Sequence, residues 1–489
     1  QDQDDETLLR EGANIELPLM VKASAGGGGR GMRLVDKADE LANAIKLARA
    51  EATAAFGNDE LILEKAIIRP RHVEVQVFGD SHGNIVHLGE RDCSIQRRHQ
   101  KGVEEAPCPI MTEALRNKMG AAAVAAARSI DYCGAGTVEF LLDESGKFYF
   151  LEMNTRLQVE HPVTELITDR DLVALQLQVA QGEPLGFSQN DVTLNGHAIE
   201  VRLYTEDPGQ DFLPTSGPVD LWSPPSGAGI RVDSGICTGQ AISPFYDPMV
   251  AKIIASGPTR DIARLRLIEA LKETVLFGTR HNRDFLVNCL EKNCFAEGKA
   301  TTAFIAEEFA EGEIVDQQPT FADNAVAAVL DMRLQHLDLY DRSVLVAPQL
   351  RDWASASPLV SRKQYSHGEE VHDLSVTPLG DSRYRVFDEN NTVVIQLLSM
   401  GDSIAHVDID ETHHVVRYHL PEEGKLYLSI DGRAAQYSDM IRVDGAQDQT
   451  AGSGSVVAPM HGLLLEVHVA TGDTVEEGQT LAVLEAMKM

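Results

Sequence analysis

The 489-residue sequence predicts an α+β protein built from several domains. Three changes of pattern along the chain support this. Strand-like and helix-like segments alternate up to about residue 312, and a helix followed by short alternating strands begins after residue 321. A stretch rich in Gly, Ser and polar residues at 445–455 then precedes a last group of strands. The chain therefore divides into an α/β-rich part, a small β domain, a flexible linker and a C-terminal β segment.

Composition excludes several classes of function. The net charge of −32 argues against binding to a nucleic-acid backbone, and no apolar run reaches the roughly 18 residues of a membrane helix. The six cysteines are sparse and form no CxxC pair, which favours a reducing compartment over a disulfide framework or a thiolate zinc site. We expect a protein with no nucleic-acid or membrane partner.

The first 66 residues contain a strand, "LPLMVKA", and a glycine cluster, "VKASAGGGGRGM", with a GxGxxG match at Gly26, Gly28 and Gly31. A dinucleotide fingerprint needs a helix after the glycines, but "MRLV" reads as a strand, and the G-K-[ST] of a P-loop is absent. Two interpretations stay open. The cluster is either a hairpin that binds ATP phosphates through backbone N–H groups, with Lys22 nearby, or a flexible surface loop.

The segment "TVEFLLDESGKFYFLEMN" (residues 137–154) predicts a β-hairpin with its turn at the Ser-Gly pair. That turn places Glu139 opposite Glu152, and strand alternation puts Asn154 on the same face. Carboxylates this close repel each other unless a cation lies between them, and Mg²⁺ prefers such oxygen ligands. The alternative is an exposed polar face.

The next segment, "NTRLQVEHP", places Arg156, Gln158 and Glu160 at alternating positions, so we expect all three on one extended face. An Arg fork binds a planar anion, and a nearby Glu could remove its proton. Bicarbonate is such an anion. The upstream segment "SIQRRHQKG" offers three further polar candidates, Gln96, His99 and Lys101.

From Phe321 the pattern changes to a helix, "ADNAVAAVLDMRLQHL", and six short alternating runs. Six such runs with turn residues between them predict a small antiparallel barrel or sandwich. The last 34 residues again contain short strands and end in "LAVLEAMKM", with Lys488 between two methionines. Taken alone, Lys488 is typical of a solvated surface lysine.

Five motifs in the first 312 residues occur in an order that resembles the biotin carboxylase branch of the ATP-grasp enzymes: "KASAGGGGRGM", "PRHVEVQVF", "ERDCSIQRRHQK", "GAGTVEF" and "FLEMNTRLQVEHPVTE". The resemblance implies an ATP-grasp lid (B) subdomain at 1–66 and a biotin carboxylase C-terminal domain at 67–312. It also implies a reaction in which ATP activates bicarbonate as carboxyphosphate, and the released CO₂ is captured on the ureido nitrogen of biotin.

Roles for individual residues follow only from this resemblance. It implies ATP contacts by Lys22, Gly27, Gly28, Gly29, Glu64, Lys65, Ile67, His72, Gln96 and His99. It implies binding of Mg²⁺ (or Mn²⁺) by Glu139, Glu152 and Asn154. It implies a bicarbonate pocket formed by Lys101, Arg156, Gln158, Val159 and Glu160. Within the catalytic set of Glu160, Arg156, Arg202 and Lys101, Glu160 corresponds to the base that deprotonates bicarbonate, and Arg202 to the arginine that stabilises the biotin enolate.

The C-terminal motif "EAMKM" resembles the biotin attachment site of carrier domains, and its flanking methionines favour biotin over lipoate. The resemblance implies biotin joined to Lys488 by a biotin protein ligase, on a partial biotinyl/lipoyl-type β-sandwich at 456–489. The region 313–444 is similar to the BT domain of acyl-CoA carboxylase α-subunits. We therefore expect an α/β hetero-oligomer whose β-subunit, with its carboxyltransferase and the acyl-CoA, binds this BT domain.

Two features depart from the family pattern. A biotin carboxylase has an N-terminal domain before the position of Gln1, and a carrier domain continues past its lysine. We therefore expect the sequence to be part of a longer chain. Two rival hypotheses are a carrier scaffold with an inactive ATP site and another kind of ATP-grasp ligase.

The acyl substrate is the least determined feature, because no residue of this chain is expected to contact it. The candidates are propionyl-, 3-methylcrotonyl- and geranyl-CoA. The segments "KASAGGGGRGM" and "LEKAIIRPRHVE" look most similar to the geranyl or methylcrotonyl branch, and we favour geranyl-CoA. The bacterial cytoplasm is the favoured location, with the mitochondrial matrix as the alternative.

Overall fold

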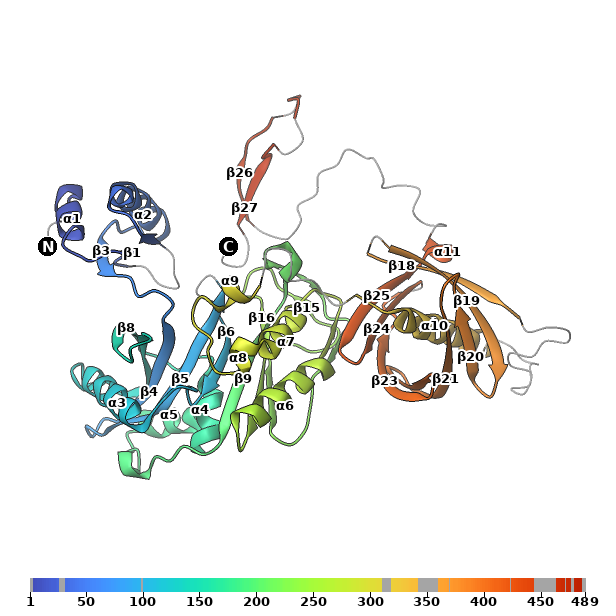
Figure 1. Cartoon of the computed structure of the whole chain (residues 1–489), viewed down its shortest axis with the longest axis horizontal. Coiled ribbons are helices and arrows are strands. Elements are labelled where there is room, and N and C mark those ends of the chain that lie inside the picture. The colour runs from blue at the N-terminus through green and yellow to red at the C-terminus, as the bar shows by residue number, and fades with distance from the viewer. Residues whose placement is uncertain are drawn as a thin grey trace.

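The computed structural model describes residues 3–25, 31–97, 100–309, 318–341, 359–368, 370–422, 424–443, 463–470, 472–475 and 479–485. Figure 1 shows an N-terminal unit, a large sheet with helices and a β-barrel following one another along the chain. Within the described residues, no helix is both long and apolar enough to cross a membrane. Some sequence-predicted site residues lie outside the described ranges, namely Gly27, Gly28, Gly29, His99 and Lys488, as does the predicted linker.

The N-terminal unit is a three-stranded antiparallel sheet in the order β2-β1-β3, covered by helix α2. Alanines and leucines at helical spacing on α2 bury one face against the sheet, and the helix ends at Gly57 in the left-handed conformation (φ 66°). The glycine cluster leads into a strand, as the sequence predicts. The elements are α1 (Asp5–Gly12), β1 (Leu19–Ala23), β2 (Met32–Val35), η1 (Ala38–Glu40), α2 (Leu41–Phe56) and β3 (Leu61–Lys65).

The large sheet has eight strands in the order β14-β16-β9-β6-β5-β4-β7-β8, and every neighbouring pair is antiparallel. Figure 1 shows its strands running between the helices on either side. The strands are β4 (Arg71–Gly79), β5 (Ile85–Arg97), β6 (Gln100–Ala106), β7 (Gly134–Leu142), β8 (Phe148–Asn154), β9 (His197–Tyr204), β14 (Ile230–Ser234) and β16 (Met249–Gly257).

The two faces of this sheet differ in polarity. One face is apolar and packs against α3 and α6, as Val73 and Val75 of β4 and Val201 of β9 show. The other face carries the alternate polar residues of the same strands under α4 and α5. Because β4 is buried at all nine positions, its alternating polar residues lie in the interior and not in solvent.

The remaining elements of this part surround the sheet. The helices are α3 (Glu113–Arg128), α4 (His161–Thr168), α5 (Leu172–Ala180), η2 (Gln189–Asp191), η3 (Pro208–Gln210), α6 (Arg260–Glu273), α7 (Arg283–Glu291), α8 (Asn293–Ala296) and α9 (Phe304–Glu308). Short strands form three two-stranded pairs: β10 (Glu206–Asp207), β11 (Leu213–Pro214), β12 (Gly217–Pro218), β13 (Leu221–Ser223), β15 (Ala241–Ile242) and β17 (Val275–Phe277).

A closed eight-stranded antiparallel barrel surrounds helix α10 (Phe321–Asp341), whose residues 325–330 are fully buried. Sequence patterns predict six of its strands and miss β18 and β25, which carry few aliphatic residues. Their inward positions are filled by groups such as Tyr365 and Tyr437 that hydrogen-bond to α10. The elements are β18 (Ser361–His367), β19 (Glu370–Gly380), β20 (Arg383–Phe387), β21 (Thr392–Met400), β22 (Ile404–Ile409), β23 (Thr412–His419), β24 (Lys425–Ile430), β25 (Arg433–Asp439) and α11 (Met440–Val443).

Replacing Asp331 by alanine should destabilise the barrel by about 2–3 kcal/mol, because it leaves a buried lysine without its counter-ion. The Asp331 carboxylate accepts from Lys363 Nζ at 2.7 Å and from Tyr365 Oη at 2.6 Å. Calorimetric unfolding would measure the loss. The exposed Glu389→Gln change serves as the control, and equal unfolding temperatures for both variants would contradict this role.

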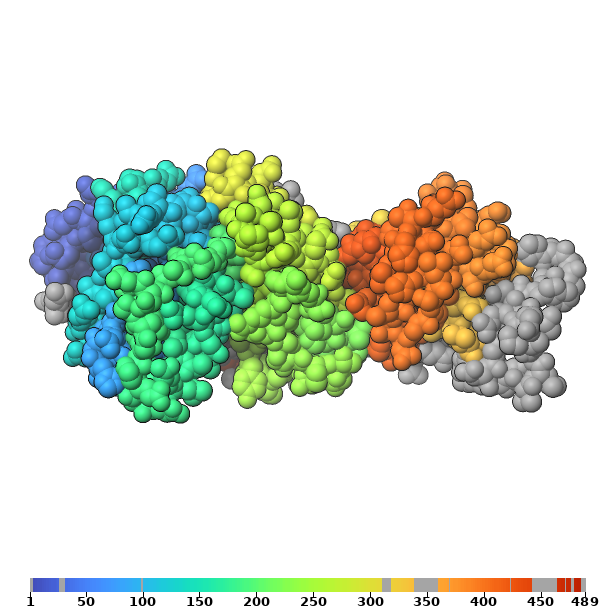
Figure 2. Space-filling model, turned by 90° about the horizontal axis from the view of Figure 1, so that it is seen from below, coloured from blue at the N-terminus to red at the C-terminus, as the bar shows by residue number. Residues whose placement is uncertain are grey.

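The barrel packs against the sheet-containing part through its β24–β25 hairpin. Tyr427 stacks on Phe277 with ring centroids 5.2 Å apart, and Arg283 Nη2 donates to Gly432 O at 2.5 Å. Gly432 has φ +83°, and a Cβ there would lie 2.8 Å from the Lys272 side chain. Figure 2 shows the two parts in contact in the space-filling view. The C-terminal hairpin consists of β26 (Leu463–Val467) and β27 (Ala482–Glu485).

Candidate active site

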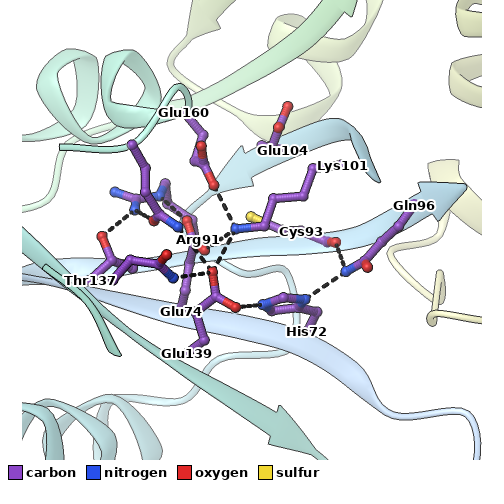
Figure 3. A network of polar contacts seen from close by, with 12 residues as sticks. His72, Glu74, Arg91, Cys93, Gln96, Lys101, Glu104, Thr137, Glu139 and Glu160 are labelled. Carbon is purple, nitrogen blue, oxygen red and sulfur yellow. Dashed lines mark hydrogen bonds and ion pairs between the residues drawn. The ribbon is translucent and has the colours of Figure 1, made fainter. Parts of the chain in front are cut away.

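Lys101 is the centre of a buried charge network on the polar face of the sheet (Figure 3). Its ammonium lies 2.5 Å from Glu74, 3.0 Å from Glu139 and 2.6 Å from Glu160. Burial would lower the pKa of Lys101, but the carboxylates outweigh burial and raise it well above its usual value. Lys101 is therefore a fixed cation that holds carboxylates from three different segments together.

Glu160 is 1% exposed and lies where the chain turns into α4. One carboxylate oxygen contacts Lys101, and the other accepts from Arg202 Nη2 at 3.0 Å. Arg202 also donates through Nε to Glu104 at 2.5 Å. Three of the four sequence-predicted catalytic residues therefore converge, and their carboxylate lies between two cations.

The fourth catalytic candidate, Arg156, does not share one extended face with Gln158 and Glu160, so that expectation was wrong. After Asn154 the chain forms a bend and a turn, because α4 begins at His161 with a proline in its first turn. Gln158 and Glu160 become buried, whereas Arg156 is exposed. Arg156 donates to Leu157 O at 3.3 Å and to Asn154 Oδ1 at 3.4 Å.

The other predicted bicarbonate residues already have partners within the protein. Gln158 donates to Glu139 at 2.9 Å and accepts from Arg91 at 3.1 Å. The carbonyl of Val159 accepts from Lys252 at 2.7 Å. These contacts fix the backbone next to Glu160.

Arg91, which sequence reasoning does not single out, is fully buried beneath the network. Its pKa is raised because nearby carboxylates, chiefly that of Glu74, outweigh the effect of burial. Its partners Glu74 and Gln76 alternate with valine in "HVEVQVF", a pattern that is equally typical of a solvated strand face. The guanidinium donates to Glu74 (2.5 Å), Gln76 (2.7 Å), Thr164 (2.9 Å), Gln158 (3.1 Å) and Thr137 (3.2 Å).

The predicted metal ligands lie as the hairpin pattern predicts. Glu139 and Glu152 are directly opposite across β7 and β8. The Asn154 amide lies 3.0 Å from Glu139 and 3.4 Å from Glu152, so the three side chains converge. Burial would raise the pKa of Glu139, but His72 and Lys101 hold it below its usual range. Two carboxyl groups and an amide therefore lie together, and carboxylate and amide oxygens are the ligands that a divalent cation prefers.

The predicted ATP contacts fall into two groups. His72 lies 3.0 Å from Glu139, and Gln96 lies 2.6 Å from His72, so both adjoin the metal candidates (Figure 3). The second group belongs to the N-terminal unit, where Lys22 pairs with Glu64 at 3.0 Å. Lys65, next to Glu64 on β3, is exposed and pairs with Glu16. Ile67 lies two residues after the end of this strand and is half-buried.

This arrangement suits proton removal from a small anion. A buried carboxylate is fixed by two cations next to a candidate cation site, so charge that develops on a bound anion would be stabilised by groups already in position. The same cations hold the carboxylate in one orientation.

Three family models match the chain. The ATP-binding domain of the carbamoyl-phosphate synthase L chain matches residues 1–188, and the biotin carboxylase C-terminal domain matches residues 200–307. The biotin-requiring enzyme family matches residues 454–489. The boundary between the first two models falls inside the continuous eight-stranded sheet.

Relatives over the whole chain include the mitochondrial methylcrotonoyl-CoA carboxylase subunit alpha of Oryza sativa, at 37% identity over 100% of this chain and 71% of that protein. The propionyl-CoA carboxylase alpha chain of Ruegeria pomeroyi is 38% identical over 100% of this chain and 75% of that protein.

Among solved structures, the biotin carboxylase domain of Hydrogenobacter thermophilus 2-oxoglutarate carboxylase, with MgADP and bicarbonate, has a TM-score of 0.61 at 44% identity. The match covers 63% of this chain and 69% of that domain. Biotin carboxylase from Campylobacter jejuni has a TM-score of 0.60 at 41% identity, over 62% and 67% of the two chains.

Proposed function

Because the chain belongs to the α-subunits of biotin-dependent acyl-CoA carboxylases, we propose that it carboxylates biotin with ATP and bicarbonate for transfer to an acyl-CoA. The enzyme is the ATP-dependent ligase component, and its cofactors are biotin, ATP and Mg²⁺. The observation that carries the proposal is Glu160, buried between Lys101 and Arg202.

In this proposal Glu160 removes the proton of bicarbonate, while Lys101 and Arg202 fix the base and stabilise developing negative charge. Glu139, Glu152 and Asn154 would hold the Mg²⁺, which supplies charge neutralisation at the nucleotide phosphates. Arg156 is exposed at the edge of this cluster, and its fork would exchange its long contacts to Leu157 O and Asn154 Oδ1 for an incoming anion.

The remaining domain assignments are also proposals. Residues 1–66 act as the lid, and the barrel with α10 binds a carboxyltransferase β-subunit. Lys488 carries biotin after modification by a biotin protein ligase. Support comes from the match of the C-terminal residues to the biotin-requiring family and from relatives that are α-subunits. The relatives are mitochondrial or bacterial, so we propose the mitochondrial matrix or the bacterial cytoplasm as the location.

The acyl preference differs from the one that the sequence motifs favour. Relatives that match the whole chain are subunits of methylcrotonoyl- and propionyl-CoA carboxylases, and these support the alternative better than geranyl-CoA. We therefore propose a short branched or linear acyl-CoA as the substrate of the assembled enzyme.

An acyl-CoA panel tests this function. The full-length α-subunit with its β-partner should form product from 3-methylcrotonyl- or propionyl-CoA, dependent on ATP and bicarbonate, at a rate well above that with geranyl-CoA. Intact mass should show one added biotin. Preferred turnover of geranyl-CoA would reverse the substrate proposal, and the absence of both biotin and turnover would contradict the function.

A further inference from the structure

Two glutamates that the proposed reaction does not use face each other beneath the active site. Glu104 on β6 lies directly opposite Glu200 on β9, and both residues are 0% exposed. Directly opposed residues in an antiparallel pair have Cβ atoms about 5 Å apart. Two carboxyl groups are therefore neighbours in the protein interior.

Few hydrogen-bond donors reach the carboxyl oxygens of these two glutamates. Glu104 accepts from Arg202 Nε through one oxygen. The other Glu104 oxygen and both Glu200 oxygens are buried without a hydrogen-bond partner in the part of the chain that the structure describes. Buried acceptors are normally paired, so three orphaned oxygens in one place require an explanation.

The surrounding cations are already engaged with other groups. Lys101 contacts three carboxylates, and Arg202 bridges Glu104 and Glu160. Lys252, opposite Arg202 on β16, contacts Val159 O at 2.7 Å and Asp233 at 3.3 Å. Five titratable or charged groups act on the pair from β5, β6, β9, β16 and the residue before α4, namely Cys93, Lys101, Arg202, Lys252 and Glu160.

We propose that Glu104 and Glu200 share one proton, so that Glu200 is a neutral acid whose O–H donates to the free oxygen of Glu104. Two buried carboxylates side by side cannot both ionise without a cation between them. The shared proton gives Glu104 a second hydrogen bond besides the one from Arg202. Glu104 in turn orients Arg202 toward Glu160. Glu104 and Glu200 are therefore positioning residues for the proposed reaction, and the kinetic part of this inference rests on that function.

The electrostatics agree with this geometry. Burial, with the nearby charges of Glu104 and Glu160, raises the pKa of Glu200 well above its usual range. Burial also raises the pKa of Glu104 to about 7, against the opposing effect of Arg202. When pH rises far enough to remove the shared proton, a second anion appears beside Glu104 and draws Arg202 away from Glu160. Activity should then fall on the alkaline side.

Infrared difference spectroscopy tests the proton without any activity measurement. At pH 7.5, wild type should show the carbonyl band of a neutral carboxylic acid, shifted in D₂O, and E200Q should lack this band. The matched control is E206Q, since Glu206 is another buried carboxyl whose pKa burial raises to about 7, and its partner is Arg97. E206Q should keep the Glu200 band. A wild-type spectrum without any acid band would overturn the proposal even if E200Q fails to fold.

Kinetics test the positioning role. The alkaline limb of the pH profile should disappear in E200Q, which keeps a donor toward Glu104 but cannot ionise. E200A should raise the KM for free biotin by about tenfold, because Arg202 loses its support, with the KM for ATP unchanged. Equal pH profiles for wild type and E200Q would overturn the role. An inactive protein that still shows the Glu200 band would contradict the proposed function and leave the shared proton supported.

Discussion

Replacing Glu160 by glutamine should lower bicarbonate-dependent ATP hydrolysis by about 10³-fold, since a positioned general base contributes on that order. Glutamine keeps the size of the side chain and one oxygen acceptor but cannot take a proton. ATP affinity should stay within about threefold, because the carboxylate contacts Lys101 and Arg202 and none of the described ATP candidates. Coupled-enzyme ATPase assays with and without bicarbonate, together with nucleotide titration, measure both quantities.

The control for this change is Glu144→Gln, the same substitution on the exposed turn between β7 and β8, which should leave both quantities unaltered. A collapse of ATP affinity in Glu160→Gln would mean that Glu160 organises the charge network and is not the base. Full bicarbonate-dependent activity would remove it from the mechanism.

Local patterns predict the parts of the site that depend on a single hairpin. Strand alternation and the turn position predict the pairing of Glu139 with Glu152, and the structure has this pair. Next to the turn, however, the strands pair one residue away from the predicted register, and a bulge between Glu139 and Phe140 restores the pair. The geometry after Asn154 does not follow from alternation, because the start of α4 forces a turn and separates Arg156 from Glu160. Alternation describes a strand and cannot predict where the strand ends.

The network beneath the site depends on neighbours that are distant in sequence. Arg91 on β5 reaches Thr164 on α4, and Glu104 faces Glu200 on another strand. Strands with polar residues at alternate positions normally expose them, so alternation alone does not indicate that this polar face is buried. Only the order of strands in the sheet brings these charges together.

The same limit applies to the barrel. Patterns of alternating aliphatic residues predict six strands, whereas β18 and β25 turn tyrosines inward to meet polar groups of α10. A helix buried on every side has no amphipathic pattern to indicate what surrounds it, as residues 325–330 show. The helix is thus predictable from its own sequence, but its central position is not.

The second large effect is expected at Arg91. Replacing it by methionine should destabilise the sheet-containing part by about 3–5 kcal/mol, the cost of leaving a buried charge uncompensated. Burial alone would raise the pKa of Glu74, but Lys101 and Arg91 together lower it to about 2. Without Arg91, the ion pair that remains to Glu74 among the described residues is the one with Lys101, which two other carboxylates already share.

Calorimetric unfolding of the purified protein would measure this loss. The control is Arg128→Met on the exposed end of α3, whose free energy of unfolding should stay within about 0.5 kcal/mol of wild type. The double variant Arg91→Met with Glu74→Gln separates charge from packing. If the uncompensated carboxylate causes the loss, removing its charge should recover much of the stability. A double variant less stable than Arg91→Met alone would show instead that Glu74 is held adequately by Lys101, and that Arg91 stabilises the site through its bonds to the neutral groups around it.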